Sequence, residues 1–185
     1  MNIKEETDRK PDYYKDIEYG KVGEIDFLDV VKHHKCFKNL KCFDVREVRE
    51  YQHVDIDFVL VDVSYKSDEL PDIKEVIKND FFKKVEVKLD SVATSTGRLP
   101  YEVVSHGHAG WCDITKCDIV YLVLTERDSD IIVKRAIVDM NKWREYCGDR
   151  KNKKKVSFLQ KEEIVDLLCD LEDMRNKGVL CWFKK

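Results

Sequence analysis

Charged and apolar side chains alternate without interruption over residues 84–89 of this chain. Successive side chains of a β-strand point to opposite faces, so Glu86 and Lys88 share one face and the apolar residues share the other. A carboxylate and an ammonium therefore lie together on one face of a predicted sheet. Same-face pairs of this kind also occur on solvated sheet surfaces, so the meaning of the pair depends on what surrounds it.

Apolar periodicity along the rest of the chain predicts an α/β order. Apolar residues recur at helical spacing over residues 16–34, and residues 56–63 are apolar enough to form a central strand. Residues 91–97 are small and polar, and we expect them to form a mobile connection. The other predicted strands are residues 42–48, 82–89, 99–105, 119–125, 131–134 and 179–183, and the other predicted helices are residues 71–79, 140–146 and 160–176.

Composition limits the class of protein. The chain has 185 residues, of which 43% are hydrophobic, and this suits one domain with a sizeable core. Seven cysteines, an odd number, without an apolar signal segment at the start indicate thiols in a reducing cytoplasm. No apolar run approaches the roughly 20 residues needed to cross a bilayer, so we expect a cytoplasmic protein without a membrane partner.

An aspartate from a neighbouring strand would turn the Glu86/Lys88 pair into a metal site. Two carboxylate oxygens and the main-chain carbonyl of Val87 suit a hard divalent cation such as Mg²⁺ or Mn²⁺. Lys88 would then stabilise charge on a scissile phosphate or steer the attacking water, and a lowered pKa would let it act as a base. These residue types in this order point to the cleavage of phosphodiesters.

Three aspartates compete for the place beside Glu86. Asp55 and Asp57 lie on one face of the predicted strand, and Asp62 lies on the other. Asp57 sits deeper in the apolar run, where a carboxylate is costly unless it is paired or bound to a cation. Asp57 is therefore the preferred ligand and Asp55 its competitor, while Asp55 and Asp62 also suit turns at the ends of the strand.

The order of these residues resembles the PD-(D/E)XK nuclease superfamily, and more closely a phage- and bacterium-associated branch of small nuclease-like proteins. The resemblance covers residues 19–143. The pieces that carry it are residues 19–24, 44–46, 51–52, 57–58, 86–88, 96–97, 101–102, 110–111 and 116–118. It implies a restriction-endonuclease-like core, with a mixed central β-sheet flanked by helices, in a single domain of residues 16–185 after a polar N-terminal arm of residues 1–15.

The resemblance also implies roles for individual residues. Asp57 and Glu86 would be the metal-binding acids, Lys88 the catalytic lysine, and Glu24 a helix-borne acid that approaches the metal or its waters. The usual Gly-Val-Asp of the family is here residues 55–57, Asp-Ile-Asp, which leaves the choice between the two aspartates open. Further residues that could contact substrate or orient the site are Gln52, Thr96 and Glu102, and Glu102 could equally pair with a surface lysine.

Positive charge is concentrated late in the chain. The net charge is −3. Residues 1–80 hold 14 basic and 20 acidic side chains, whereas residues 134–155 hold 9 basic and 3 acidic ones. Lys153, Lys154 and Lys155 belong to a basic run that could track the phosphates of a nucleic acid. The alternative is a solvated linker, since no aromatic residue is interleaved to stack on bases.

A second metal-binding pattern has to be weighed against the first. His106, His108, Cys112 and Cys117 lie within 12 residues and could ligate zinc, although their spacing matches no common zinc motif. The alternative is a loop in which Trp111 packs on the core.

The leading expectation is a metal-dependent nuclease that acts on DNA before RNA, in a phage, mobile-element, repair or defence setting. Its partner would be nucleic acid, and a homodimer is compatible with cutting both strands. The first alternative is a catalytically silent module of the same fold that binds nucleic acid or protein. The second is a structural protein of a mobile element.

Overall fold

The computed structural model describes residues 13–105, 108–127, 129–148 and 165–183. These residues form a mixed α/β structure with a six-stranded mixed sheet and a smaller antiparallel sheet. The six-stranded sheet has the order β1 (Leu40–Asp44), β2 (Phe58–Asp62), β3 (Lys83–Asp90), β6 (Ile119–Thr125), β7 (Ile132–Asp139) and β9 (Leu180–Trp182). Only its β3–β6 pairing is parallel. The smaller sheet has the order β5 (His108–Ala109), β4 (Arg98–Ser105) and β8 (Val165–Asp170). The predicted mixed central sheet flanked by helices is thus confirmed.

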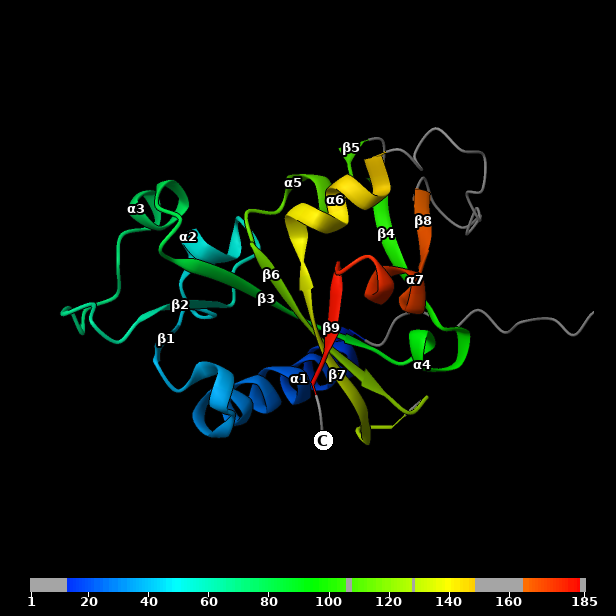
Figure 1. Ribbon diagram of the computed structural model, residues 1–185, viewed down its shortest axis with the longest axis horizontal. Coiled ribbons are helices and arrows are strands. Elements are labelled where there is room, and N and C mark those ends of the chain that lie inside the picture. Colours follow the sequence, from blue (N-terminus) through cyan, green and yellow to red (C-terminus); the bar gives the residue numbers. More distant parts are fainter. Residues whose placement is uncertain (1–12, 106–107, 128, 149–164, 184–185) are drawn as a thin grey trace, which may run out of the picture.

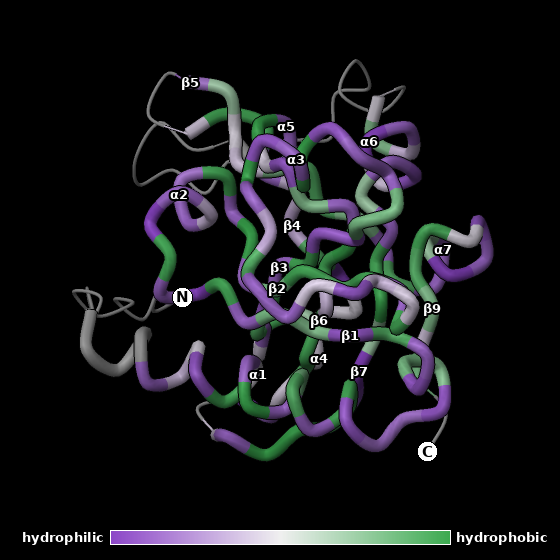
Figure 2. Tube along the Cα trace, turned by 90° about the vertical axis from the view of Figure 1, so that its left-hand side faces the viewer, coloured by the Kyte–Doolittle hydropathy of each residue, from purple (hydrophilic) through white to green (hydrophobic). Residues whose placement is uncertain are grey.

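Helices lie on both sides of the large sheet. The helices are α1 (Tyr13–His33), α2 (Arg49–Gln52), α3 (Ile73–Lys78), α4 (Val92–Thr96), α5 (Trp111–Ile114), α6 (Met140–Gly148) and α7 (Leu171–Asn176), with a 3₁₀ turn at Lys35–Phe37. Figures 1 and 2 show α1 on one side of the strands, and α2, α3, α5 and α6 on the other. None of the described helices is long and apolar enough to span a membrane.

A glycine and an ion pair bring α1 close to the sheet. A Cβ added at Gly23 would lie 3.1 Å from Cγ1 of Val87, so a larger residue would fit only if that side chain shifted by a few tenths of an ångström. The Asp26 carboxylate accepts a bidentate pair of bonds from Arg135 and a 2.7 Å bond from the hydroxyl of Tyr121. Arg135 therefore has an ion-pair partner on α1. The sequence predicts that the strand ends at Lys134, but β7 continues to Asp139.

Strand alternation divides the apolar residues of the sheet between two cores. On the α1 side the strands contribute Phe58, Leu60, Tyr121 and Val123. On the other side β2 contributes Val59 and Val61, and β6 contributes Val120, Leu122 and Leu124. Both β2 and β6 are therefore apolar on their two faces, as expected of strands covered on both sides.

The central strand β3 departs from this pattern. Its residues Val85, Val87 and Leu89 pack toward α1 with the rest of that core. Its opposite face carries four consecutive charged positions, namely Lys84, Glu86, Lys88 and Asp90. Charges are costly inside a sheet unless each has a partner, so this face is where a functional site is expected.

The C-terminal part of the chain corrects one prediction. The sequence predicts a helix over residues 160–176, but residues 165–170 form β8 and only Leu171–Asn176 is helical. Residues 160–164 lie outside the described residues. The leucine spacing suits either structure, and antiparallel pairing with β4 selects the strand. The side chain of Asp170 then caps α7 by accepting the N–H of Asp173 at 2.8 Å.

Residues 91–97 are also more regular than predicted. They contain α4, whose start is held by a 2.6 Å bond from the Ala93 N–H to Oδ1 of Asp90. The helix ends at Gly97, which has φ 67° and so a conformation that favours glycine. The seven cysteines all lie in the described residues, and none forms a disulfide, as predicted.

Candidate active site on the charged face of β3

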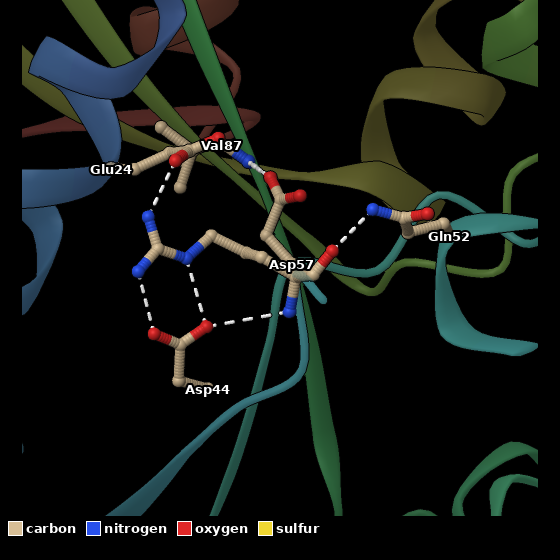
Figure 3. A network of polar contacts seen from close by, with 6 residues as sticks. Glu24, Asp44, Gln52, Asp57 and Val87 are labelled. Atoms are coloured by element: carbon tan, nitrogen blue, oxygen red, sulfur yellow. Dashed lines mark hydrogen bonds and ion pairs between the residues drawn. The ribbon is translucent and has the colours of Figure 1, made fainter. Parts of the chain in front are cut away.

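The end of the β2–β3 pairing places Asp57 opposite Glu86. Phe58 pairs with Val85 in the antiparallel register, so Asp57 stands one step further, at a bend before β2 begins. Its N–H donates to the carbonyl of Val85 at 2.9 Å, and its carboxylate Oδ2 accepts the N–H of Val87 at 2.7 Å (Figure 3). The Asp57 side chain therefore continues the ladder where the backbone of β2 turns away.

Asp57 and Glu86 are neighbouring carboxyls, the first partly exposed and the second buried. Glu86 is only 7% exposed, and its charge acts on the pKa of Asp57. Burial, and then the charge of Glu86, raise the pKa of Asp57 to about 7. Burial also raises the pKa of Glu86, although Lys88 opposes the rise. Two adjacent carboxyls cannot both ionise at low cost, so Asp57 keeps its proton to a higher pH than an isolated aspartate does.

Lys88 lies directly beside this pair. Its Nζ is 2.7 Å from Oε1 of Glu86, and it stands 4.4 Å from the centre of the Trp111 ring. Burial alone would lower the pKa of Lys88, but Glu86, Asp57 and Asp55 together outweigh burial and the net shift is upward. The lowered pKa that the sequence analysis suggested for Lys88 is therefore not found. The neighbouring acids favour its ammonium form.

Glu24 reaches the same region from α1 but is paired with an arginine. Its Oε2 is 2.5 Å from Nη1 of Arg46, and the Arg46 Nη2 is 2.5 Å from Oδ2 of Asp44 (Figure 3). The guanidinium also lies 5.1 Å from the ring centre of Phe58. The charge of Glu24 still contributes to the raised pKa of Asp57. Glu24 thus lies within electrostatic range of Asp57, and Arg46 balances its charge.

Sequence reasoning gave Arg46 no role. Its N–H and Nε both donate to Oδ1 of Asp44, which closes a turn, so β1 ends at Asp44 instead of continuing to residue 48. The side chain of Gln52 donates to the Arg46 carbonyl and holds this turn from α2. Gln52 therefore supports the site through Arg46. The spacing of Asp44 and Arg46, two residues apart at the end of a predicted strand, was the signal available in the sequence.

The other two aspartates occupy turns. Asp55 adopts φ 56°, in the left-handed region that aspartate tolerates, and its N–H donates to Gln52 O at 3.2 Å. Burial raises the pKa of the Asp55 carboxyl, while Lys88 and Trp111 lower it, so this carboxyl also faces the site. Asp62 is exposed at the far end of β2 and accepts the N–H of Ser64. Of the three, Asp57 is the one whose carboxylate is bonded to β3.

Thr96 and Glu102 each accept a hydrogen bond from a backbone N–H group. Thr96 Oγ1 donates to Val92 O at 3.0 Å and accepts the Arg98 N–H at 3.2 Å, so it closes α4 beyond the end of β3. Glu102 Oε1 accepts the backbone N–H of Trp111 at 2.6 Å. Glu102 therefore anchors the backbone of Trp111, whose ring contacts Lys88, a contact that the sequence analysis did not suggest.

A pocket of about 450 Å³ opens beside Lys88, between the two sheets. Asp90 and Lys88 line it from β3, Trp111 from α5, and Glu102 and Asp166 from the smaller sheet. Glu102 and Asp166 are direct cross-strand neighbours, and burial together with the charge of Glu102 raises the pKa of Asp166. The pocket thus joins an apolar floor to several hydrogen-bond acceptors and one cation, a combination typical of ligand sites.

The donor set suits a cation that keeps several waters. Within the described ranges no group of three or more His, Cys, Asp or Glu side chains could hold a metal ion. Asp57 and Glu86 supply two carboxylates, and the Val87 carbonyl could add a third oxygen. Mg²⁺ is commonly bound through one or two carboxylates and water, so this set fits it better than it fits a fully protein-ligated ion.

The alternative zinc pattern gains no support from the described residues. His106 lies outside them, and His108, Cys112 and Cys117 do not gather into a metal-binding group. Burial raises the pKa values of Cys112 and Cys117 to about 12, which disfavours the thiolates that zinc requires. Lys153, Lys154 and Lys155 also lie outside the described residues.

No family model matches this chain, and no curated protein or solved structure matches it either. The chemistry of the β3 site therefore carries the functional argument.

Proposed function

We propose that this protein is a metal-dependent nuclease with a PD-(D/E)XK type site in a restriction-endonuclease-like core. It hydrolyses phosphodiester bonds, in DNA before RNA, with Mg²⁺ or Mn²⁺ as cofactor. The observation that carries this proposal is the charged face of β3, where Lys88 is 2.7 Å from Glu86 and the Asp57 carboxylate accepts the N–H of Val87 between them.

A purely structural role does not account for the Asp57–Glu86 pair. The Glu86–Lys88 ion pair would be balanced without a second carboxyl, and Asp57 adds negative charge where burial already raises its pKa. Placing two acids together is unfavourable for stability unless something binds between them. A divalent cation would bind the charged form of the pair and relieve the repulsion.

The residues divide the work of hydrolysis between them. Asp57, Glu86 and the Val87 carbonyl would hold the cation, which lowers the pKa of a bound water and neutralises developing charge. Lys88 stays positively charged and stabilises the extra negative charge on phosphate. The pocket beside Lys88 gives the nucleotide next to the scissile phosphate a place to lie.

A second candidate is a module of the same fold that binds nucleic acid without cutting it. One observation favours it: Glu86 is paired with Lys88, and Glu24 is paired with Arg46. A protein that never binds a cation would have to neutralise its buried acids in this way. The two candidates differ in whether a divalent cation binds to Asp57 and Glu86.

Calorimetry and cleavage assays on the same samples test the proposal. Mn²⁺ or Mg²⁺ is titrated into the wild type and into Asp57→Ala/Glu86→Ala, and a mixed panel of DNA and RNA is offered as substrate. We expect binding and cleavage to be lost together in the double variant, whereas Asp62→Ala, at the exposed end of β2, keeps both. Lys88→Ala should bind the cation and lose most of the rate. A wild-type protein that neither binds a cation nor cleaves nucleic acid would favour the second candidate, the module that binds without cutting.

The basic run supplies a separate test of the nucleic-acid partner. Replacing Lys153, Lys154 and Lys155 with alanine should flatten the salt dependence of binding, by about 0.9 in the logarithmic slope for each phosphate that the variant no longer neutralises. An unchanged slope of affinity against salt concentration would indicate that the basic run is a solvated linker.

A further inference from the structure

Lys88 has two partners, and only one of them is independent of the proposed cation. Glu86 Oε1 is 2.7 Å from Nζ, and the ring centre of Trp111 is 4.4 Å from it. A cation bound to Glu86 would compete with Lys88 for the negative charge of the same carboxylate and so weaken this contact. The lysine side chain is long, flexible and 43% exposed, so without a second contact its ammonium would move freely.

Trp111 is well placed to provide that contact because its backbone is fixed. It is the first residue of α5, and its N–H donates to Oε1 of Glu102 at 2.6 Å. The preceding residue, Gly110, donates its N–H to the Val103 carbonyl at 2.8 Å. Both bonds join the start of α5 to β4.

The contact at Gly110 leaves no room for adjustment. A Cβ at this position would lie 2.3 Å from the Glu102 carbonyl oxygen and 2.7 Å from the Val103 carbonyl carbon. Both are backbone atoms of β4 and not the ends of flexible side chains, so neither can move away cheaply. Glycine is therefore required for α5 to approach β4 this closely, and this approach sets the position of the indole.

We propose that Trp111 is a positioning residue for Lys88, anchored by Glu102 and by the close contact at Gly110. The indole face attracts the ammonium and holds it between the carboxyl pair and the pocket. The catalytic consequence rests on the proposed function: with Trp111 in place, Lys88 faces the phosphate even when Glu86 is engaged elsewhere. The position of Lys88 is a claim about the protein alone and can be tested without any substrate.

NMR of the lysine ε-methylene groups tests the position directly. A proton above an indole face is shifted upfield by the ring current, and Lys88→Arg assigns the signal. We expect the Lys88 signal to be shifted upfield in the wild type, to lose the shift in Trp111→Leu and to keep part of it in Trp111→Phe. Glu102→Leu should reduce the shift, and Glu102→Gln, which retains an oxygen acceptor, should largely preserve it.

The chain offers a matched control for these variants. Lys134 stands 5.0 Å from the ring centre of Trp182 in a second lysine–tryptophan pair on β7 and β9. Trp182→Leu should move the Lys134 signal and leave Lys88 unchanged. A Lys88 signal that is the same in the wild type and in Trp111→Leu, while the Lys134 control responds, would overturn the inference.

Cleavage kinetics then separate this inference from the proposed function. Trp111→Leu should lower kcat by about tenfold or more, with cation affinity unchanged and with partial rescue in Trp111→Phe. A kcat unaffected by Trp111→Leu, although the ring-current shift has disappeared, would contradict the catalytic consequence. A wild type that shows the shift but no cleavage would refute the proposed function and leave the positioning contact established.

Discussion

Replacing Asp57 with asparagine should stabilise the cation-free protein at alkaline pH. The substitution keeps the shape of the side chain and an oxygen that can accept the Val87 N–H, but it removes one of two adjacent buried charges. A carboxyl whose pKa is about 3.8 in the unfolded chain and about 7 in the folded one destabilises the fold as pH rises between these values. Above pH 7 the destabilisation is complete, and below about pH 4 it is absent because both states are protonated.

The size of the effect follows from the difference between the two pKa values. A shift of roughly 3 units corresponds to an upper limit of about 4 kcal/mol. Asp57 is partly exposed and titrates together with Glu86, and the Val87 N–H bonds less strongly to a neutral acceptor. We therefore expect about half of the limit, ~2 kcal/mol, or a rise in Tm of about 4–8 °C at pH 8.

Thermal unfolding between pH 4 and pH 8 measures this effect. Asp57→Asn should unfold at a higher temperature than the wild type at pH 8, and the gap should close toward pH 4. Asp62→Asn is the control, since Asp62 is fully exposed and the Ser64 N–H lowers its pKa, so its loss should not raise Tm. Added Mg²⁺ should raise the Tm of the wild type but not that of Asp57→Asn. An Asp57→Asn protein no more stable than the wild type at pH 8 would refute the reasoning.

Two further ion pairs give predictions of their own. Lys84→Met breaks the 3.0 Å pair between Nζ and Oδ2 of Asp118 and should lower the free energy of unfolding by about 3–5 kcal/mol. The double variant Lys84→Met/Asp118→Asn keeps an oxygen acceptor for the backbone N–H of residue 84, so urea unfolding should show that it recovers much of the lost stability. A double variant as unstable as Lys84→Met alone would contradict this. Arg46→Met leaves Glu24 unpaired near the carboxyl pair, so the midpoint of the Asp57 titration, followed by carbon NMR, should move to higher pH. Arg46→Lys should give an intermediate midpoint, and no movement in either variant would exclude the coupling.

Much of the central sheet could be predicted because strand alternation is a local property. The pattern over residues 84–89 correctly assigns Glu86 and Lys88 to one face, and the apolar run after residue 55 correctly predicts β2. The start of β2 depends on a non-local feature. Asp57 bends away from the strand because its side chain takes over a backbone partner on β3, and no neighbouring residue encodes that bond.

Other parts could not be predicted because their partners are distant in sequence. The spacing of the leucines in residues 164–171 fits a helix as well as a strand, and only the pairing of residues 165–170 with β4 decides between them. The Glu24–Arg46 pair joins residues 22 positions apart. The pKa of Lys88 depends on the balance between burial and Glu86, and burial cannot be known before the second sheet is placed. Sequence pattern determines which face a side chain occupies, whereas its partners depend on tertiary packing.

Calorimetric titration of Mn²⁺ in buffers of different ionisation enthalpy tests the central claim most directly. If a cation displaces the proton that Asp57 holds below pH 7, binding near pH 6 should release a proton, and the affinity should rise between pH 6 and pH 8. Proton release should fall toward zero at pH 8, where the pair is already ionised. Mn²⁺ binding without proton release at pH 6, or binding that survives Asp57→Asn unchanged, would contradict a cation site on the charged face of β3.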